Sequence, residues 1–206
     1  MTIEAVVFDI GNVLIQWDPE RFYDARLGVE ACKRLFAEVP LHDMNLGLDR
    51  GDPFRASVYD LADQHPTWAE EIRHWHDSWL EFAHTDIPQS VRLLRALRAK
   101  GVPVLALSNF GIGTFEVAVT AYPFLAEFDQ SYISGHLGCI KPDAEIYQHL
   151  EQGAGLPANR LLFADDRPEN IDAAQARGWQ GHLFTTPQAW AARLVEAGLL
   201  SEQDAQ

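Results

Sequence analysis

The sequence predicts an α/β fold, a doubly wound parallel sheet with an all-helical segment inserted into it, and two patterns carry that prediction. Short apolar runs without polar alternation recur at residues 6–8, 102–107 and 160–164, which is typical of strands buried on both faces. Helical stretches separate the later runs, and such alternation favours a parallel sheet with right-handed crossovers. Residues 21–84 show helical spacing alone, so we expect a helical insert after the first strand.

The first strand ends in a turn that carries a carboxylate. Asp9 follows the apolar run directly, and Gly11 and Asn12 allow the chain to turn tightly. Ligands of open α/β sheets bind beyond the carboxyl ends of the strands, which makes Asp9 a candidate site residue. Taken alone, Asp9 is more simply explained as a turn residue, and the later segments change that balance.

The insert begins with a helix start signal. Asp18 is a suitable N-cap, and Pro19 occupies the favoured first helical position. Apolar residues then recur at helical spacing, and the aromatic ones favour packing between helices over a cofactor site. Residues 50–52 are expected to form a polar loop between two insert helices. We therefore divide the chain into a Rossmann-like core, residues 1–16 and 87–206, and a helical insert, residues 17–86.

The remaining elements follow one another as expected of an α/β sheet. A helix over residues 90–99, stopped by Gly101, precedes the strand at 102–107, which ends in Ser108 and Asn109. The strand at 160–164 ends in Asp165 and Asp166. The other elements expected are helices from about 114 and at 142–150, 169–177 and 187–197, and short strands at 131–134 and 181–184.

Parallel strands bring their carboxyl ends to one edge of the sheet, so the polar residues that follow different strands should meet there. These residues are Asp9, Ser108, Asn109, Asp165 and Asp166. Three carboxylates close together repel one another and need a cation, and ligands that are all oxygen favour Mg²⁺ over zinc.

A lysine offers a second positive charge for this site. Lys141 stands next to Pro142 at an expected helix start, which makes it a candidate fixed charge. Considered alone, Lys141 is more simply explained as an ordinary surface lysine.

Composition excludes some partners. The chain has 206 residues, a formal net charge of −14 and no basic patch, which argues against binding to nucleic acid or to an anionic membrane. The two cysteines, Cys32 and Cys139, have neither metal-type spacing nor a disulfide framework, as is usual in a reducing compartment. With no signal segment or membrane span, we expect a cytoplasmic protein, and its oligomeric state stays open.

The same residues resemble a known family. Residues 9–14, Ser108-Asn109, Lys141-Pro142, and Asp165-Asp166 with Asn170 are similar to the four ordered motifs of the haloacid dehalogenase-like hydrolase superfamily. The insert resembles the helical cap of that family, and the resemblance covers essentially the whole chain. It implies a phosphatase that uses Mg²⁺ to hydrolyse a small phosphorylated metabolite.

The resemblance also implies a role for each motif residue. Asp9 would be the nucleophile that forms an aspartyl-phosphate, Ser108 and Asn109 would hold phosphoryl oxygens, and Lys141 would neutralise charge on nucleophile and substrate. The implied Mg²⁺ ligands are Asp9, the Gly11 carbonyl, Asp166 and Asp165, with the direct contact of the last two left open. Asn170 would orient the metal shell.

Gly11 departs from the pattern of the family, whose phosphatases mostly carry a second aspartate there as general acid and base. General acid–base catalysis contributes typically ~10²–10⁴-fold, so the loss needs an explanation. One is that another group supplies the proton, with Asp18, His42 and His84 as candidates. The other is a substrate whose leaving group needs little help, such as a sugar 1-phosphate.

Two other functions stay open at this stage. A 2-haloacid dehalogenase would use the same aspartate on carbon without a metal, but it would gain nothing from the extra negative charge of Asp165 and Asp166. A catalytically silent protein that binds a phosphorylated ligand is conceivable because of Gly11. The presence of Asp9, Lys141, Asp165 and Asp166 makes this silent protein the weaker alternative.

Overall fold

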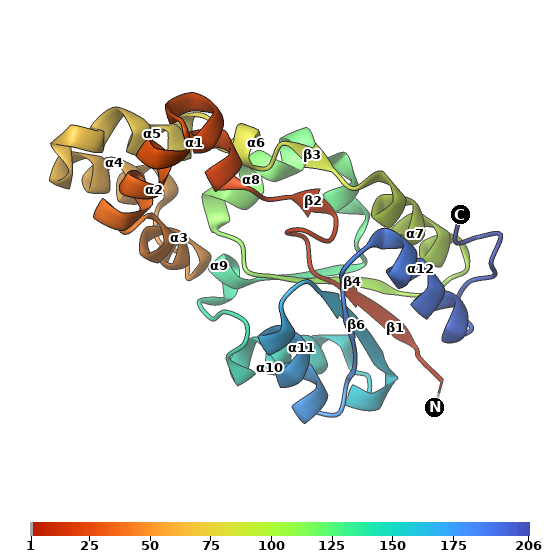
Figure 1. The fold of residues 1–206 in the computed structure, drawn as a ribbon. Coiled ribbons are helices and arrows are strands. Elements are labelled where there is room, and N and C mark those ends of the chain that lie inside the picture. The colour runs from red at the N-terminus through yellow and green to blue at the C-terminus, as the bar shows by residue number, and fades with distance from the viewer. Residues whose placement is uncertain (1) are drawn as a thin grey trace.

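The computed structural model describes residues 2–206 and contains a five-stranded sheet in the order β5-β4-β1-β6-β7. Every neighbouring pair in this sheet is parallel, and the central strand β1 is buried along its whole length. The α/β fold class is therefore confirmed (Figure 1). The strands are β1 (Ala5–Phe8), β4 (Val104–Ser108), β5 (Gln130–Ile133), β6 (Leu161–Asp165) and β7 (Gln180–Leu183).

Strand register decides which polar residues meet. Phe8 at the end of β1 pairs with Ala106 on β4 and with Ala164 on β6. Asp9 is the next residue, and its backbone N–H still donates to the carbonyl of Ala164, so it leaves the sheet level with Asp165. The predicted convergence of strand ends is therefore present in the structure.

Helices cover both faces of the sheet, which makes it doubly wound. Val6 and Phe8 pack with α7 (Pro88–Ala99) and α12 (Pro187–Glu196) on one face. Ala5 and Val7 pack with α10 (Ala144–Ala154) and α11 (Pro168–Ala176) on the other (Figure 1). The remaining helical segments of this part are α8 (Ile112–Ala121), η2 (Pro123–Glu127), α9 (Ser134–Leu137) and η3 (Ala158–Arg160).

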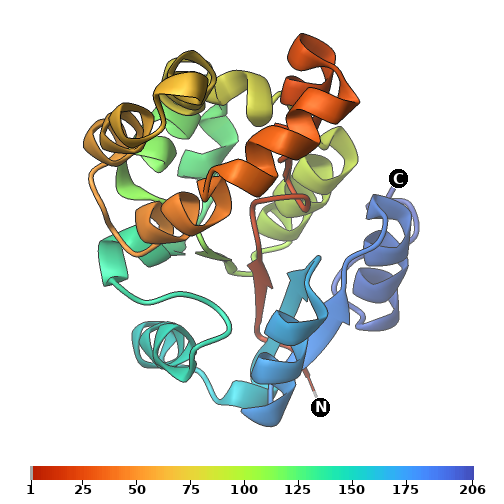
Figure 2. The same ribbon diagram turned by 60° about the vertical axis from the view of Figure 1, so that its left-hand side comes forward.

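The helical insert lies beyond the carboxyl end of β1, at the end of the molecule opposite the N-terminus (Figures 1 and 2). A short antiparallel pair, β2 (Ile15–Gln16) with β3 (Thr85–Asp86), ties its two connections together and was not predicted. The domain boundaries at 17 and 86 stay a prediction. The insert contains α1 (Pro19–Leu27), α2 (Val29–Glu38), α3 (Leu41–Asp49), α4 (Phe54–Gln64), η1 (Pro66–Trp68), α5 (Ala69–Asp77) and α6 (Trp79–Phe82).

Several predicted boundaries differ from those in the structure, among them the starts of α7 at Pro88 and of β4 at Val104. Ser134 begins α9 instead of ending a strand, and α8 begins at Ile112, two residues before the expected start. The helix expected from Pro142 begins at Ala144, because residues 140–143 form a turn in which the Asp143 N–H donates to the Ile140 carbonyl. Lys141 therefore lies in a turn before the helix.

An aromatic cluster holds the insert together. Trp75 is 1% exposed. The centroid of its ring lies 5.2 Å from that of Phe82 and 6.0 Å from that of Trp17, and both contacts are edge-to-face. The prediction that the aromatic residues pack between helices is confirmed for these residues. Within residues 2–206, no helix combines the length and the apolar character that crossing a membrane requires.

We expect Trp75→Ala to destabilise the protein strongly. Removing a buried tryptophan loses apolar burial and leaves a cavity, which costs about 3–5 kcal/mol. Urea unfolding monitored by circular dichroism measures this loss. Leu80→Ala is the control, because Leu80 is 40% exposed and surface changes usually stay within about 0.5 kcal/mol. Equal midpoints for the two variants would show that the aromatic cluster does not stabilise the insert.

Candidate active site

The carboxyl group of Asp9 lies buried at the end of β1. Its Oδ1 accepts hydrogen bonds from the Ile10 backbone N–H and from Ser108 Oγ, both at 2.7 Å, and pairs with Lys141 Nζ at 2.9 Å. Burial raises the pKa of Asp9 to about 7, and the charge of Asp165 adds to this rise, although Lys141 opposes it. The Ile10 N–H, Ser108 and Lys141 therefore hold the Asp9 carboxyl group in place at the end of β1.

Lys141 is buried and bridges two carboxylates. Its Nζ lies 2.9 Å from Asp9 Oδ1 and 2.6 Å from Asp165 Oδ2. Burial alone lowers the pKa of Lys141, but the two carboxylates outweigh burial and hold that pKa above its usual value. The simple explanation of Lys141 as a surface residue is wrong.

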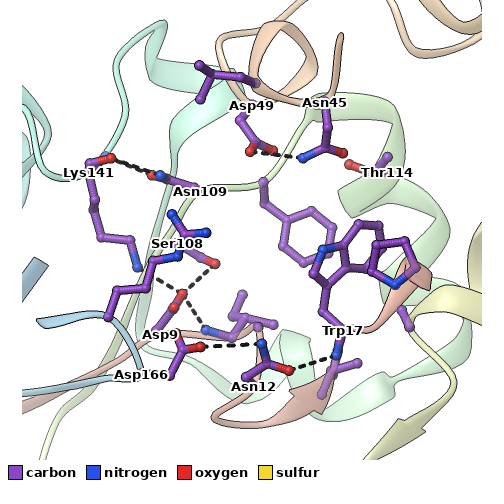
Figure 3. Close-up of a pocket in the computed structure, with 18 of the residues that line it drawn as sticks. Asp9, Asn12, Trp17, Asn45, Asp49, Ser108, Asn109, Thr114, Lys141 and Asp166 are labelled. Atoms are coloured by element: carbon purple, nitrogen blue, oxygen red, sulfur yellow. Dashed lines mark hydrogen bonds and ion pairs between the residues drawn. The ribbon is translucent and has the colours of Figure 1, made fainter. Parts of the chain in front are cut away.

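Asn109 positions this lysine through its backbone. The side-chain oxygen of Asn109 accepts from the Lys141 N–H at 2.7 Å, and its side-chain nitrogen donates to the Lys141 carbonyl at 3.0 Å (Figure 3). The amide of Asn109 is thus used to fix the turn that carries Lys141. A contact from Asn109 to a phosphoryl oxygen stays a prediction.

Asp165 and Asp166 differ in their surroundings. Asp165 is fully buried and accepts hydrogen bonds from the Arg167 N–H at 2.8 Å and from Asn170 Nδ2 at 3.0 and 3.1 Å. Asp166 is more open and accepts one from Asn12 Nδ2 at 3.3 Å. Burial, and then the charge of Asp165, raises the pKa of Asp166 above its usual value. Asp165 is therefore the fixed member of the pair and Asp166 the accessible one.

The donor set fits a hard cation such as Mg²⁺. Asp9, Asp165 and Asp166 each offer one carboxylate oxygen, and these atoms lie within 4.8 Å of one another. Burial is the largest cause of the raised pKa of Asp9, and a bound cation would favour its ionised form. Within residues 2–206, the buried Oδ1 of Asn170 has no hydrogen-bond partner, so it can accept from a group bound here.

A cavity of about 600 Å³ opens above these residues, between the sheet edge and the insert. Gly11 lines it, beside the predicted cluster. Asn45 and Asp49 from the insert line the side opposite Asp9 (Figure 3). Its apolar wall consists of Ile10, Ile15, Trp17, Leu46, Trp79, Ala83 and Phe110.

Asp49 is the functional candidate that the sequence did not reveal. It is the last residue of α3 and is partly buried, and its Oδ2 accepts from Asn45 Nδ2 at 3.3 Å. Burial raises the pKa of Asp49 to about 7, and the charge of Asp9 contributes to that rise. In the sequence Asp49 only precedes a polar loop, and no motif or spacing distinguishes it.

The three residues named as replacement acids occupy different places. Asp18 caps α1 by accepting from the Arg21 N–H at 2.9 Å, as its sequence pattern predicts. Asp18 and His84 line a second cavity, whose residues include Asn12 and Trp17 but none of the three clustered aspartates. His42 lines the main cavity at its exposed rim, where its Nε2 lies 3.4 Å from Glu20 Oε1.

Full-length relatives of this chain include phosphatases. The chain is 27% identical over 183 residues to the sesquiterpene phosphatase astK of Aspergillus oryzae, a match that covers 88% of this chain and 90% of the relative. It is 25% identical over 189 residues to the D-ribitol-5-phosphate phosphatase of Bacteroides thetaiotaomicron, with 86% and 90% covered.

Other relatives match over shorter stretches. A (S)-2-haloacid dehalogenase of Pseudomonas fluorescens is 30% identical over 112 residues, which cover 54% of this chain and 45% of the dehalogenase. The chain likewise spans only 34% of the drimenol cyclase drtB of Aspergillus calidoustus.

Solved structures share the fold. The HAD family enzyme bt-2542 of Bacteroides thetaiotaomicron superposes with a TM-score of 0.75 at 20% identity, covering 94% of this chain and 99% of that one. A structure of the same enzyme in complex with magnesium and inorganic phosphate gives a TM-score of 0.69, again at 20% identity, with 89% and 94% covered. The family model of haloacid dehalogenase-like hydrolases matches residues 3–178, and the chain therefore belongs to the haloacid dehalogenase-like hydrolases.

Proposed function

We propose that this protein is a Mg²⁺-dependent phosphatase that hydrolyses a small phosphorylated metabolite through an aspartyl-phosphate on Asp9. The observation that carries the proposal is the pairing of a buried, strand-end carboxylate with a buried lysine at 2.9 Å. Phosphoryl transfer requires an in-line nucleophile and positive charge around the phosphoryl oxygens, and this pair offers both.

In this proposal the chain's own residues act on the phosphoryl group in two steps. An Asp9 carboxylate oxygen attacks phosphorus, and the leaving alcohol departs. Lys141 and the hydroxyl of Ser108, both within hydrogen-bond reach of Asp9, offset the negative charge of the phosphoryl oxygens. Water then attacks the phosphorus of the aspartyl-phosphate and releases inorganic phosphate.

The cation belongs with the three clustered aspartates. Asp9, Asp166 and Asp165 would hold it, together with the Gly11 carbonyl, and Asn170 would orient the groups around it. When bound, Mg²⁺ supplies positive charge, which favours the ionised form of Asp9 and offsets the negative charge of the phosphoryl oxygens.

The relatives support a phosphatase, and they do not narrow the class of alcohol that carries the phosphate. The two full-length relatives named as phosphatases act on a sesquiterpene and on D-ribitol 5-phosphate, so this scaffold is used for different alcohols. The sugar 1-phosphate predicted from Gly11 is one member of this class. A cytoplasmic location stays part of the proposal and is consistent with the two buried free cysteines, Cys32 and Cys139.

A dehalogenase is the second candidate, because dehalogenases are among the relatives. The arrangement of the site weighs against it. Asp166 brings a further carboxylate, which has no ion pair with a lysine within residues 2–206, beside the group that would have to receive an anionic haloacid. A silent phospho-ligand binding protein would have no need of an ionisable nucleophile held by Lys141.

We expect Asp9→Asn to abolish hydrolysis of 4-nitrophenyl phosphate while the protein stays folded, because an amide is not a competent nucleophile. Steady-state rates and circular dichroism measure both effects. Asp172→Asn on the exposed face of α11 is the matched control and should keep its activity. Retention of more than a small fraction of the rate by Asp9→Asn would exclude Asp9 as the nucleophile.

Chelation should stop phosphate release, and added Mg²⁺ should restore it better than Ca²⁺. Ca²⁺ binds with longer and looser coordination, which misplaces the groups around the phosphoryl oxygens. The measurement is the rate of release after dialysis against chelator, followed by titration with each cation. Full activity in excess chelator, or release of halide from a 2-haloacid under the same conditions, would favour the dehalogenase.

A further inference from the structure

The backbone does not require glycine at position 11. A Cβ built on Gly11 meets no atom within 4 Å, and the left-handed residue of the turn is Asn12, at φ 54°. The space around the backbone therefore does not exclude a side chain at position 11. Its absence leaves the proposed reaction without a carboxylic acid at the position where related phosphatases mostly carry one.

The insert presents carboxyl and imidazole groups to the same cavity. Glu20, His42 and Asp43 lie at its exposed rim, where water competes for any proton transfer. Asp49 is the partly buried one, and it faces Asp9 across the cavity (Figure 3). An in-line leaving group points away from the nucleophile, which is toward the side that Asp49 occupies.

A hydrogen-bond chain anchors Asp49 in the insert. Asn45 Nδ2 donates to Asp49 Oδ2, and Trp75 Nε1 donates to Asn45 Oδ1, each at 3.3 Å. Trp75 is itself buried in the aromatic cluster, so the orientation of the carboxyl group depends on the core of the insert. Of the Asp49 carboxyl oxygens, Oδ2 receives this bond and Oδ1 has no hydrogen bond to any residue in 2–206, which leaves Oδ1 for a ligand.

We propose that Asp49 is the general acid and base of this phosphatase and replaces the carboxylate missing at Gly11. This inference rests on the proposed function. When Asp9 attacks phosphorus and the bond from phosphorus to the alcohol oxygen breaks, the carboxyl proton of Asp49 passes to that oxygen. Asp49 is then a carboxylate, and it takes a proton from the water that attacks the aspartyl-phosphate. The bond from phosphorus to Asp9 breaks, phosphate leaves, and Asp49 is protonated again.

The surroundings of Asp49 include groups that raise its pKa and groups that lower it. Burial and Asp9 favour its neutral form, and Lys141, Arg167 and Arg50 favour its charged form. Their balance raises the pKa of Asp49 to about 7, which makes both forms available near neutral pH. Glu20, His42 and Asp43 are the other ionisable groups that the insert presents to the same cavity. Because leaving-group departure needs protonated Asp49, kcat/KM for an alkyl phosphate should fall on the alkaline side.

The experiment compares substrates whose leaving groups need protonation to different degrees. The protein with Mg²⁺ is assayed on 4-nitrophenyl phosphate, whose leaving group departs without a proton, and on alkyl phosphates of rising leaving-group pKa. We expect Asp49→Asn to lose about 10²–10⁴-fold in kcat/KM on the alkyl phosphates and only a few-fold on the aryl phosphate. In Asp49→Asn, the fall of kcat/KM for alkyl phosphates at alkaline pH should disappear as well.

Three further variants sharpen the result. Asp52 lies in the loop just after α3 and does not line the cavity. Asp52→Asn should therefore leave kcat/KM unchanged on both kinds of substrate. Asp49→Glu keeps the acid and should retain part of the alkyl phosphate rate. Adding Gly11→Asp to Asp49→Asn should restore alkyl phosphate hydrolysis selectively, because it returns a carboxyl group to the cavity at a position that has room for a Cβ.

Each other outcome overturns the assignment. An equal loss on aryl and alkyl phosphates would make Asp49 a structural residue, and no loss would make it irrelevant. A loss confined to alkyl phosphates in His42→Asn instead would move the role to His42. The rate on 4-nitrophenyl phosphate also reports that each variant is folded. If the unmodified protein hydrolyses no phosphate monoester, the proposed function itself fails, and that failure is visible before any variant is made.

Discussion

The buried bridge from Lys141 to Asp9 and Asp165 is the interaction on which the rest of the site depends. A lysine and two carboxylates removed from water are costly unless they are paired at short distance and hydrogen-bonded, and here both conditions hold. The sheet satisfies them by register, because β1 and β6 end side by side. Asn109 satisfies them from the other side by fixing the backbone of Lys141. The same bridge brings Asp9 and Asp165 close to Asp166, and one carboxylate oxygen from each of the three could hold a metal ion.

The insert turns this charged edge into an enclosed site. Its aromatic cluster contains Trp17 and Trp75, and Trp17 also belongs to the cavity wall. Trp75 donates a hydrogen bond to Asn45, which in turn donates one to Asp49. The packing that stabilises the insert therefore also orients a carboxyl group above Asp9. Stability and chemistry are therefore coupled through one side chain, and Trp75→Phe would separate them by keeping an aromatic ring in the cluster and removing the indole N–H donor.

Much of this arrangement could be predicted from the sequence, because it follows from short-range patterns. Buried runs predict parallel strands, parallel strands align their ends, and Asp9, Ser108 and Asp165 meet for that reason. The pair of β2 and β3 was missed because two residues per strand carry no period. The contact of the Asn109 side chain with the backbone of Lys141 was missed, because it depends on where the turn at 140–143 falls. Asp49 was missed because its position over Asp9 depends on how α3 is folded back, which no local pattern encodes.

The central claim is that Asp9 becomes phosphorylated, and it can be tested on the covalent intermediate itself. The protein is mixed with a phosphate monoester that carries radiolabelled phosphorus in the presence of Mg²⁺, quenched rapidly in acid, and digested for peptide mapping. We predict label on the peptide that contains Asp9, at a level that falls as the substrate is consumed. Turnover without labelled protein, or label on a peptide that lacks Asp9, would contradict the account.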